Sequence, residues 1–184
     1  MQNAAVLDPA ERARNGEGVD RLWAAWRLKY VTEDKSAPGD CPFCGLETED
    51  PQADKARYVL YRSEHSVALL NRFPYTNGHV LVLPFEHCDA LDGLDPALAA
   101  DLHETLMITV KALRTCYQPD GLNLGMNMGS AAGAGIANHL HYHAVPRWSG
   151  DTNFMPVVGE AKVLPETLEM TWEKLRKTFG DLER

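Results

Sequence analysis

The sequence predicts a single α+β domain in which a mainly antiparallel sheet carries one long helix and a second, C-terminal helix. Three observations lead to this class: short apolar runs bounded by turn residues, one long amphipathic run, and the lack of an internal repeat or interior linker. The 184 residues, 45% hydrophobic and 24% charged, suit one domain of ordinary size. We expect residues 1–20 to form a flexible polar tail and residues 21–184 to form the domain.

The first half of the domain is expected to contain three strands. Apolar residues recur at helical spacing over 21–31, which predicts a short packed segment or a dimer contact. Strands are expected at 58–61 and 67–70 because apolar and aromatic residues gather there. A turn with Pro and an Asn-Gly pair then leads into a third strand that ends at Pro84.

The second half is expected to contain two helices and two strands. Asp95 and Pro96 predict the cap and first position of a long amphipathic helix that runs to about Tyr117. The alternating segment L-N-L-G-M-N-M-G predicts a strand, and the histidine-rich run after it predicts another. A last helix is expected to begin near Pro165 and to end at Gly180.

Composition argues against two classes of partner. The net charge is −8, with 26 acidic and 18 basic residues and no basic stripe, so we expect no binding to long nucleic acid. No apolar run approaches the roughly 20 residues that span a bilayer, and the first residues lack the apolar core of a signal peptide. A cytoplasmic protein without a membrane partner is expected. A small anionic substrate remains compatible if backbone N–H groups or helix ends supply local positive potential.

Two of the four cysteines form the motif C-P-F-C at Cys41 and Cys44. In a cytoplasmic chain this spacing indicates a metal half-site or a redox pair. A redox pair is expected at the start of a helix after a strand, whereas this motif follows a charged loop, which favours zinc. The candidate ligands for the other half are His87, His139 and His65.

The run N-H-L-H-Y-H-A-V-P-R-W places three histidines at alternate positions. In a strand, His139, His141 and His143 would share one face. Such a face is compatible with a metal-binding tract or with a nucleophilic site. The preceding segment 127–135, N-M-G-S-A-A-G-A-G, offers backbone N–H groups that suit a phosphate. Together the two segments predict an anion held beside an imidazole nucleophile.

These blocks resemble the histidine-triad (HIT) superfamily of nucleotide hydrolases and transferases. The segment H-L-H-Y-H-A-V is similar to its signature, and L-L-N-R-F-P-Y-T-N-G-H-V-L-V-L-P is similar to its nucleoside-binding half. The blocks W-x-x-W-R, C-P-F-C, P-R-W and G-D-T-N-F-M resemble the bacterial branch that includes diadenosine tetraphosphate phosphorylases. The resemblance covers nearly the whole chain after residue 20 and implies a HIT-like fold.

The resemblance also implies roles for individual residues. His141 would attack the α-phosphorus to give a nucleotidyl-histidine, and His143 would lie within reach of the phosphate or leaving group. Asn71 would bind the ribose, with Leu69 and Leu81 in the adenine pocket. The phosphate loop would contain Asn127, Gly133 and Gly135. The chain departs from the family pattern where Ala134-Gly135 replaces a Gln followed by Ser or Thr, so backbone amides take over that role or the acceptor differs.

In zinc-bearing relatives the ligands match Cys41, Cys44, His87 and His139, which implies a structural zinc that anchors the first histidine. Magnesium accompanying the polyphosphate and a homodimer are implied in the same way. The expected reaction is cleavage of diadenosine tetraphosphate with phosphate as acceptor, which gives ATP and ADP. The alternatives are a hydrolase that uses water, on this or another nucleotide conjugate, and a non-enzymatic nucleotide-binding or zinc-binding adaptor.

Several other residues have two interpretations each. Trp148 and Trp23 could stack on a base, although packing is the more common role of tryptophan. Arg147 could reach a phosphate or a surface carboxylate. His79 and His65 are expected to serve packing or turns rather than catalysis.

Overall fold

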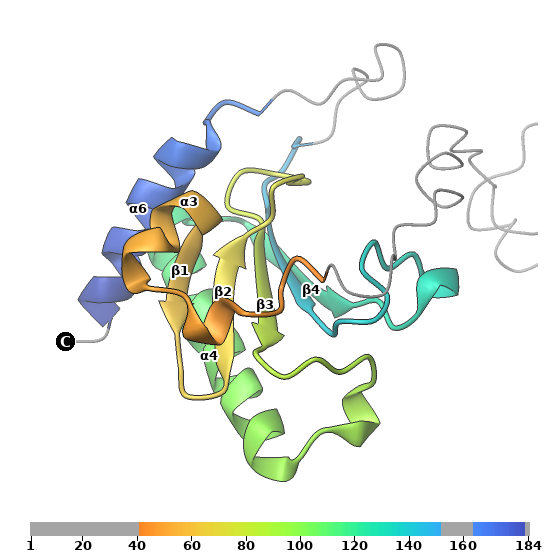
Figure 1. Ribbon diagram of the computed structural model, residues 1–184. Coiled ribbons are helices and arrows are strands. Elements are labelled where there is room, and N and C mark those ends of the chain that lie inside the picture. The colour runs from red at the N-terminus through yellow and green to blue at the C-terminus, as the bar shows by residue number, and fades with distance from the viewer. Residues whose placement is uncertain (1–40, 152–163, 183–184) are drawn as a thin grey trace, which may run out of the picture. The chain divides into compact units, whose positions relative to one another are not determined.

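A five-stranded antiparallel sheet in the order β1-β2-β3-β5-β4 organises the described part of the chain (Figure 1). The computed structural model describes residues 41–151 and 164–182. The strands are β1 (Val59–Arg62), β2 (Ser66–Leu70), β3 (Val80–Pro84), β4 (Gly121–Met126) and β5 (Tyr142–Arg147). The helices are α3 (Asp54–Arg57), α4 (Pro96–Tyr117) and α6 (Leu168–Leu182), and the 3-10 turns are η1 (Leu46–Thr48), η2 (Pro51–Ala53), η3 (Leu91–Gly93) and η4 (Ser130–Ala132). The expected α+β class is confirmed.

Helix α4 begins and ends where the sequence predicts. The Asp95 carboxylate accepts a hydrogen bond from the Ala97 N–H at 2.8 Å, and Pro96 occupies the first helical position, where no N–H is needed. At the other end Gln118 adopts a left-handed conformation with φ of 45°, and its N–H donates to Arg114 O. The long helix therefore spans 96–117.

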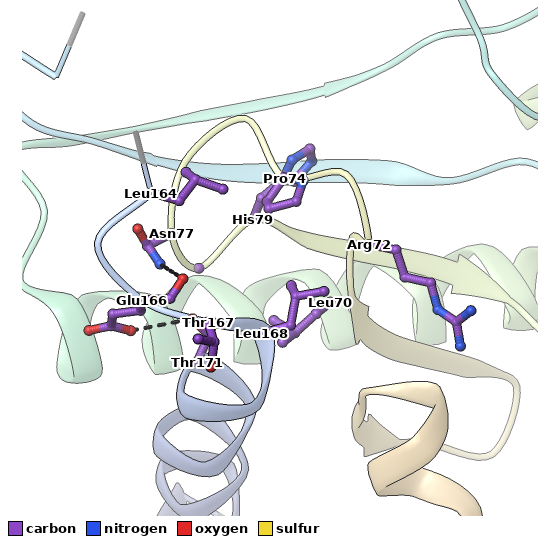
Figure 2. A pocket seen from close by; sticks show the side chains of 11 residues that line it. Leu70, Arg72, Pro74, Asn77, His79, Leu164, Glu166, Thr167, Leu168 and Thr171 are labelled. Carbon is purple, nitrogen blue, oxygen red and sulfur yellow. Dashed lines mark hydrogen bonds between the residues drawn. The ribbon is translucent and has the colours of Figure 1, made fainter. Parts of the chain in front are cut away.

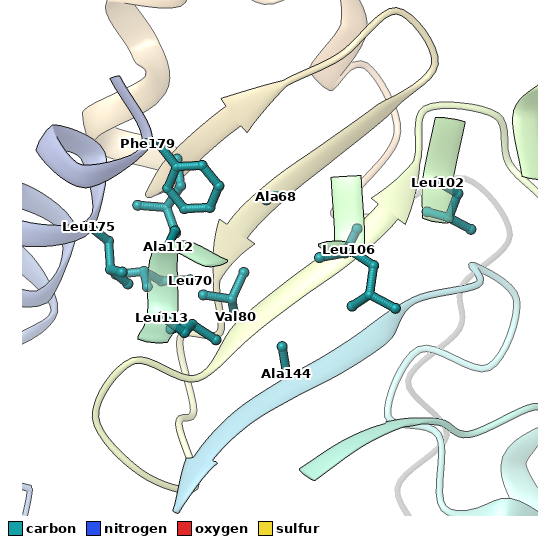
Figure 3. Close-up of a cluster of buried hydrophobic side chains, with 12 residues drawn as sticks. Ala68, Leu70, Val80, Leu102, Leu106, Ala112, Leu113, Ala144, Leu175 and Phe179 are labelled. Atoms are coloured by element: carbon teal, nitrogen blue, oxygen red, sulfur yellow. The ribbon is translucent and has the colours of Figure 1, made fainter. Parts of the chain in front are cut away.

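One face of the sheet packs against α4 and α6. Alternate residues of β2 and β3, together with Ala144 of β5, point to this side (Figure 3). They meet buried side chains of the two helices, which include Leu102, Leu106, Leu113, Leu175 and Phe179. Burial of these apolar side chains is the main force that holds the helices on the sheet.

The remaining residues of β2 and β3, which alternate with those in the first core, point to the opposite face of the sheet. Leu69 of β2 is paired with Leu81 of β3, and Leu81 is paired in turn with His143 of β5. Phe43 and Leu46, from the segment before β1, cover the apolar part of this face. The row from Leu69 to His143 therefore brings an apolar surface directly to the histidine segment.

Several element boundaries differ from expectation. Strand β5 begins only at Tyr142, because the Leu140 N–H bonds to Cys88 O at 2.6 Å, outside the sheet. His139 and His141 therefore precede the strand. Helix α6 begins at Leu168 rather than near Pro165, since the Thr167 hydroxyl accepts from the Met170 N–H at 3.3 Å, and it continues through Gly180 to Leu182.

Some predictions concern residues that the structure does not describe. The polar tail 1–20, the segment 21–31 with Trp23, and most of the G-D-T-N-F-M block lie outside the described residues. Among the helices in 41–151 and 164–182, none combines the length and the apolar character that a membrane crossing requires.

Candidate functional site

Four side chains with metal-ligating atoms converge at one end of the histidine segment. The Cys41 and Cys44 turn is closed by a bond from the Cys44 N–H to Cys41 O. Cys41 Sγ lies 3.3 Å from His139 Nδ1, and Cys44 Sγ lies 3.1 Å from His87 Nδ1. All four ligand atoms lie within 4.8 Å of one another. Two sulfurs and two imidazole nitrogens at this spacing suit a tetrahedral zinc ion.

The protonation of His139 also fits a metal ligand. Its Nε2 lies 2.9 Å from the carbonyl oxygen of Pro84, so Nε2 carries the proton and donates it. Burial lowers the pKa of His139, so the ring is neutral at pH 7 and Nδ1 has a lone pair. That lone pair faces the two thiols. A ligating histidine held by a backbone carbonyl through its other nitrogen is the usual arrangement at zinc sites.

His65, the third candidate for this half-site, lies elsewhere. It is 44% exposed, and its Nε2 is 3.9 Å from the carboxylate of Glu64. His65 lies in the turn between β1 and β2, and its backbone carbonyl accepts from the Phe85 N–H at 2.9 Å, next to the Ser66–Pro84 pair of β2 and β3. The turn role expected for His65 agrees with this position.

His141 has the tautomer that a nucleophile needs. Its Nδ1 lies 2.8 Å from the carbonyl oxygen of His139, so Nδ1–H donates and Nε2 keeps its lone pair. Burial lowers the pKa of His141, which favours the neutral ring. The ring is buried and lies 5.6 Å from Phe43 and 5.0 Å from His143 between centroids. A neutral imidazole oriented by a backbone carbonyl can attack phosphorus through Nε2.

A fourth histidine joins this cluster, although the sequence predicted a packing role for it. His79 Nε2 lies 2.9 Å from His143 Nδ1. The Tyr75 N–H donates to His79 Nδ1 at 3.1 Å, so Nδ1 is the acceptor and Nε2–H is the donor. His143 therefore accepts at Nδ1 and carries its proton on Nε2. Burial, followed by repulsion from His141, lowers the pKa of His143 to about 4.

The sequence does contain a signal for His79. It stands two residues before Leu81 and immediately before β3, so an extended chain places both side chains on the same face. That face also holds the histidine segment, because Leu81 pairs with His143. His79 is almost fully buried. Its position therefore makes His79 part of the candidate site.

The residues expected to bind the nucleoside lie on this same face. Leu69 and Leu81 are buried neighbours in the apolar cluster under Phe43. Asn71 follows β2 at the edge of the histidine group. Its Oδ1 accepts from the Phe73 N–H at 2.9 Å, and its Nδ2 lies 3.4 Å from His79 Nδ1. Small-ligand sites commonly combine an apolar surface, here Leu69 and Leu81, with a few oriented polar groups, here the Asn71 amide.

The glycine-rich loop starts beside the histidine segment. Met126, the last residue of β4, pairs with Tyr142, so Asn127 leaves the sheet next to the histidines. Gly133 has a φ of 89°, and its N–H donates to Ser130 O at 2.9 Å. The Ala134 N–H donates to Gly129 O at 3.4 Å, so the amides of both Gly133 and Ala134 are used inside the loop.

A separate cavity of about 260 Å³ lies between the β2–β3 loop and the beginning of α6 (Figure 2). Leu70 and Leu168, which line it, belong to the core on the helix side of the sheet. Asn77 closes it through a hydrogen bond from Nδ2 to Glu166 O at 3.2 Å. The cavity meets the candidate site only at His79 and is not the site itself.

Two residues for which the sequence left two interpretations, Arg147 and Trp148, contact other side chains of the same chain. Arg147 donates to both carboxylate oxygens of Asp151, at 2.6 and 2.8 Å, and to Asn123. The Trp148 ring lies 6.2 Å from the ring of Tyr117 in an edge-to-face arrangement. The contacts of Arg147 with a carboxylate and of Trp148 with Tyr117 favour the structural interpretation of each.

Comparison with known proteins agrees with the geometry of the site. The HIT domain family model matches residues 52–150. The AP-4-A phosphorylase of Mycobacterium tuberculosis is 35% identical over 83% of this chain and 80% of its own length. A Zn-bound histidine triad family protein from Mycobacterium smegmatis has 27% identity and a TM-score of 0.57 over 69% of this chain and 86% of its own.

A hypothetical histidine triad nucleotide-binding protein from Sulfolobus tokodaii has a similar structure, with 27% identity and a TM-score of 0.61. The alignment covers 78% of this chain and 95% of that one. The matched region contains the sheet, its face with Leu69 and Leu81, and the three alternating histidines. The chain belongs to the HIT domain family.

Proposed function

We propose that this HIT protein cleaves dinucleoside polyphosphates, with diadenosine tetraphosphate as substrate, through a covalent nucleotide on His141 and with orthophosphate as acceptor. The observation that carries the proposal is the bond from His141 Nδ1–H to the His139 carbonyl, which leaves a neutral Nε2 lone pair beside an apolar nucleoside face. The similarity to an AP-4-A phosphorylase supports the substrate and acceptor.

The proposed reaction has two displacements. In the first, His141 Nε2 bonds to the α-phosphorus while the bond from phosphorus to the bridging oxygen breaks and ATP leaves. In the second, an oxygen of orthophosphate bonds to the same phosphorus while the P–N bond breaks, which gives ADP and restores the ring. The Nε2–H of His143 would donate to the oxygen on which negative charge develops.

Binding residues are proposed for both parts of the substrate. Leu69 and Leu81 would contact the adenine, and Asn71 would bind the ribose hydroxyls. The loop with Asn127, Gly133 and Gly135 would lie along the phosphates, with the amides of Gly135 and Ile136 as donors. This loop compensates for the chain's net charge of −8, which by itself opposes an anionic ligand.

We propose a structural zinc at Cys41, Cys44, His87 and His139. The spacing of the four ligand atoms and the Nδ1 lone pair of His139 support it, as does the Zn-bound relative. When bound, the ion would hold His139, whose carbonyl orients His141. The zinc site would then help to position the nucleophile, His141, through His139. Magnesium accompanying the polyphosphate stays a prediction.

We also propose a homodimer built on strand β4. This strand ends the sheet, and Leu124 on it is 47% exposed. The outer backbone groups of an apolar edge strand can form hydrogen bonds with the same strand of a second copy, in an antiparallel arrangement. The division into a tail over 1–20 and one domain over 21–184, and the cytoplasmic location, stay predictions from the sequence.

Product analysis tests the proposed function. The protein is incubated with diadenosine tetraphosphate, with and without orthophosphate, and the nucleotides are separated. ATP and ADP that form only with orthophosphate support the phosphorylase, whereas ATP and AMP in either case identify a hydrolase. The replacement of a family side chain by Ala134-Gly135 makes the second outcome the alternative to exclude. Binding without turnover would identify the adaptor.

A further inference from the structure

Two large aromatic side chains stand exposed on the loop 71–79, which joins β2 to β3 beside the histidine cluster. Phe73 is 85% exposed and Tyr75 is 52% exposed. Single exposed apolar residues are ordinary on a protein surface. Two exposed aromatic residues, two positions apart in a loop beside a candidate active site, can instead form a contact surface for a ligand.

The Tyr75 ring continues the row of rings that forms the site. It lies 5.9 Å from the ring of His143, with only 16° between the two planes, and 4.6 Å from the ring of His79. The row of contacts runs from Phe43 through His141 and His143 to Tyr75. Tyr75 therefore stands next to the histidine whose Nε2–H is proposed to meet the leaving group.

The backbone of the loop is tied to the residues of the site. The Phe73 N–H donates to Asn71 Oδ1 at 2.9 Å, and the Tyr75 N–H donates to His79 Nδ1 at 3.1 Å. The Thr76 hydroxyl donates to Pro146 O at 2.9 Å, which fastens the loop to β5. Both rings are thus presented by a fixed backbone, which reduces the conformational entropy that the loop loses when a ligand binds.

We propose that Phe73 and Tyr75 form an aromatic platform for the base of the departing nucleotide. This inference rests on the proposed function and adds the selection of dinucleoside over mononucleoside polyphosphates. One nucleoside would occupy the face at Leu69 and Leu81, and the other would leave past His143 toward the platform. Aromatic rings stack on any base through its π face, without regard to charge. This contact suits a protein whose net charge of −8 opposes a long polyphosphate.

The test compares two substrates that differ in the second nucleoside. Diadenosine tetraphosphate has it, and adenosine 5′-tetraphosphate has the same phosphate chain without it. Both would pass through the same nucleotide on His141. Steady-state kcat/KM is measured for each substrate, and their ratio reports the contribution of the distal base. Wild type, Phe73→Ala, Phe73→Trp and Tyr75→Ala are compared.

Loss of base stacking in Phe73→Ala is expected to lower the ratio by roughly 5- to 100-fold, mainly through KM for the dinucleoside. Phe73→Trp restores the ratio because it restores the ring. The matched control is Leu91→Ala, which removes a 40% exposed apolar side chain on η3, outside the histidine cluster, and keeps the wild-type ratio.

The platform is wrong if the ratio is unchanged in both alanine variants while wild type cleaves the two substrates. It is also wrong if Phe73→Ala keeps the ratio and turns a dimer into a monomer in sedimentation, because the ring then covers a second copy. If wild type cleaves neither substrate, the proposed function fails, and the platform fails with it.

Discussion

His79 Nε2 lies 2.9 Å from His143 Nδ1, and the N–H of Tyr75 on the other nitrogen of His79 fixes the direction of this bond. The proton of His143 is thereby kept on Nε2. The His139 carbonyl does the same for His141 in the opposite sense, because it keeps the proton on Nδ1. One of two neighbouring imidazoles thus presents an N–H and the other a lone pair at Nε2, which suits the donor and the nucleophile proposed for a displacement at phosphorus.

Replacement of His79 by leucine is expected to lower kcat. His143 Nδ1 loses its donor, and the ring can turn or change tautomer. His143 Nδ1 faces the buried His79, so this acceptor would be left without a partner; such a loss costs about 1–3 kcal/mol, and kcat should fall roughly 5- to 100-fold. The control is His65→Leu, which removes an exposed histidine outside the cluster.

If His79 acts by positioning, the His79→Leu variant should change kcat much more than KM and should shift the pH profile of kcat. Equal losses in thermal stability and in activity, with an unchanged pH profile, would instead assign His79 a purely structural role. His79→Gln, which can still donate a hydrogen bond, should recover part of the rate.

Loss of one thiol of the cysteine and histidine cluster is expected to release zinc and to destabilise the fold. Cys44→Ser replaces the thiol whose Sγ lies 3.1 Å from His87 Nδ1. The melting temperature should fall by roughly 5 °C or more, since each kcal/mol shifts a domain of this size by about 2–4 °C. Zinc is measured by elemental analysis of the purified protein, and Cys116→Ser is the control. An equal zinc content in both variants would refute the site.

The stability of the protein should fall in acid partly because of His143. Burial, followed by repulsion from His141, lowers the pKa of this residue from 6.5 to about 4. Between these values the unfolded chain binds a proton that the folded chain does not, so the free energy of unfolding decreases as the pH falls through this window. Above pH 6.5 this residue has no effect. Because His143 is partly exposed to solvent, the slope should be less than about 1.4 kcal/mol per pH unit.

Urea unfolding at about pH 7 and about pH 5 measures this contribution when wild type is compared with His143→Phe. The variant keeps a ring of similar size but cannot bind the proton, so it should lose less stability between the two pH values. His139 and His141 change in the same direction in both proteins and cancel in the difference. Equal losses in the two proteins would contradict the assignment.

Much of the fold can be predicted from local patterns. The apolar run before Pro84 gave β3, and Asp95 with Pro96 located the start of α4, because caps and strand alternation are local physics. The start of β5 could not be predicted in this way. It depends on the bond from the Leu140 N–H to Cys88 O, which joins segments that are far apart in the sequence.

The candidate site shows the same division. The spacing of the histidines predicted that His139, His141 and His143 lie near one another, although only His143 lies in β5. His87 was one of three candidate partners of the two cysteines, and the family resemblance selected it together with His139. The proton positions could not be predicted, since they depend on where the Pro84 and His139 carbonyls point. His79 was assigned to packing because a lone histidine before a strand is ambiguous until its neighbours in the sheet are known.

The covalent intermediate is the most direct test of the mechanism. The protein is mixed with diadenosine tetraphosphate in the absence of orthophosphate and denatured in alkali, because a phosphoramidate is labile in acid. Intact mass and peptide mapping then locate the adduct. We predict one AMP group on the peptide with His141, its conversion to ADP when orthophosphate is added before denaturation, and no adduct in His141→Asn. Product formation by wild type without an adduct, or an adduct on His143, would contradict the assignment of His141 as the nucleophile.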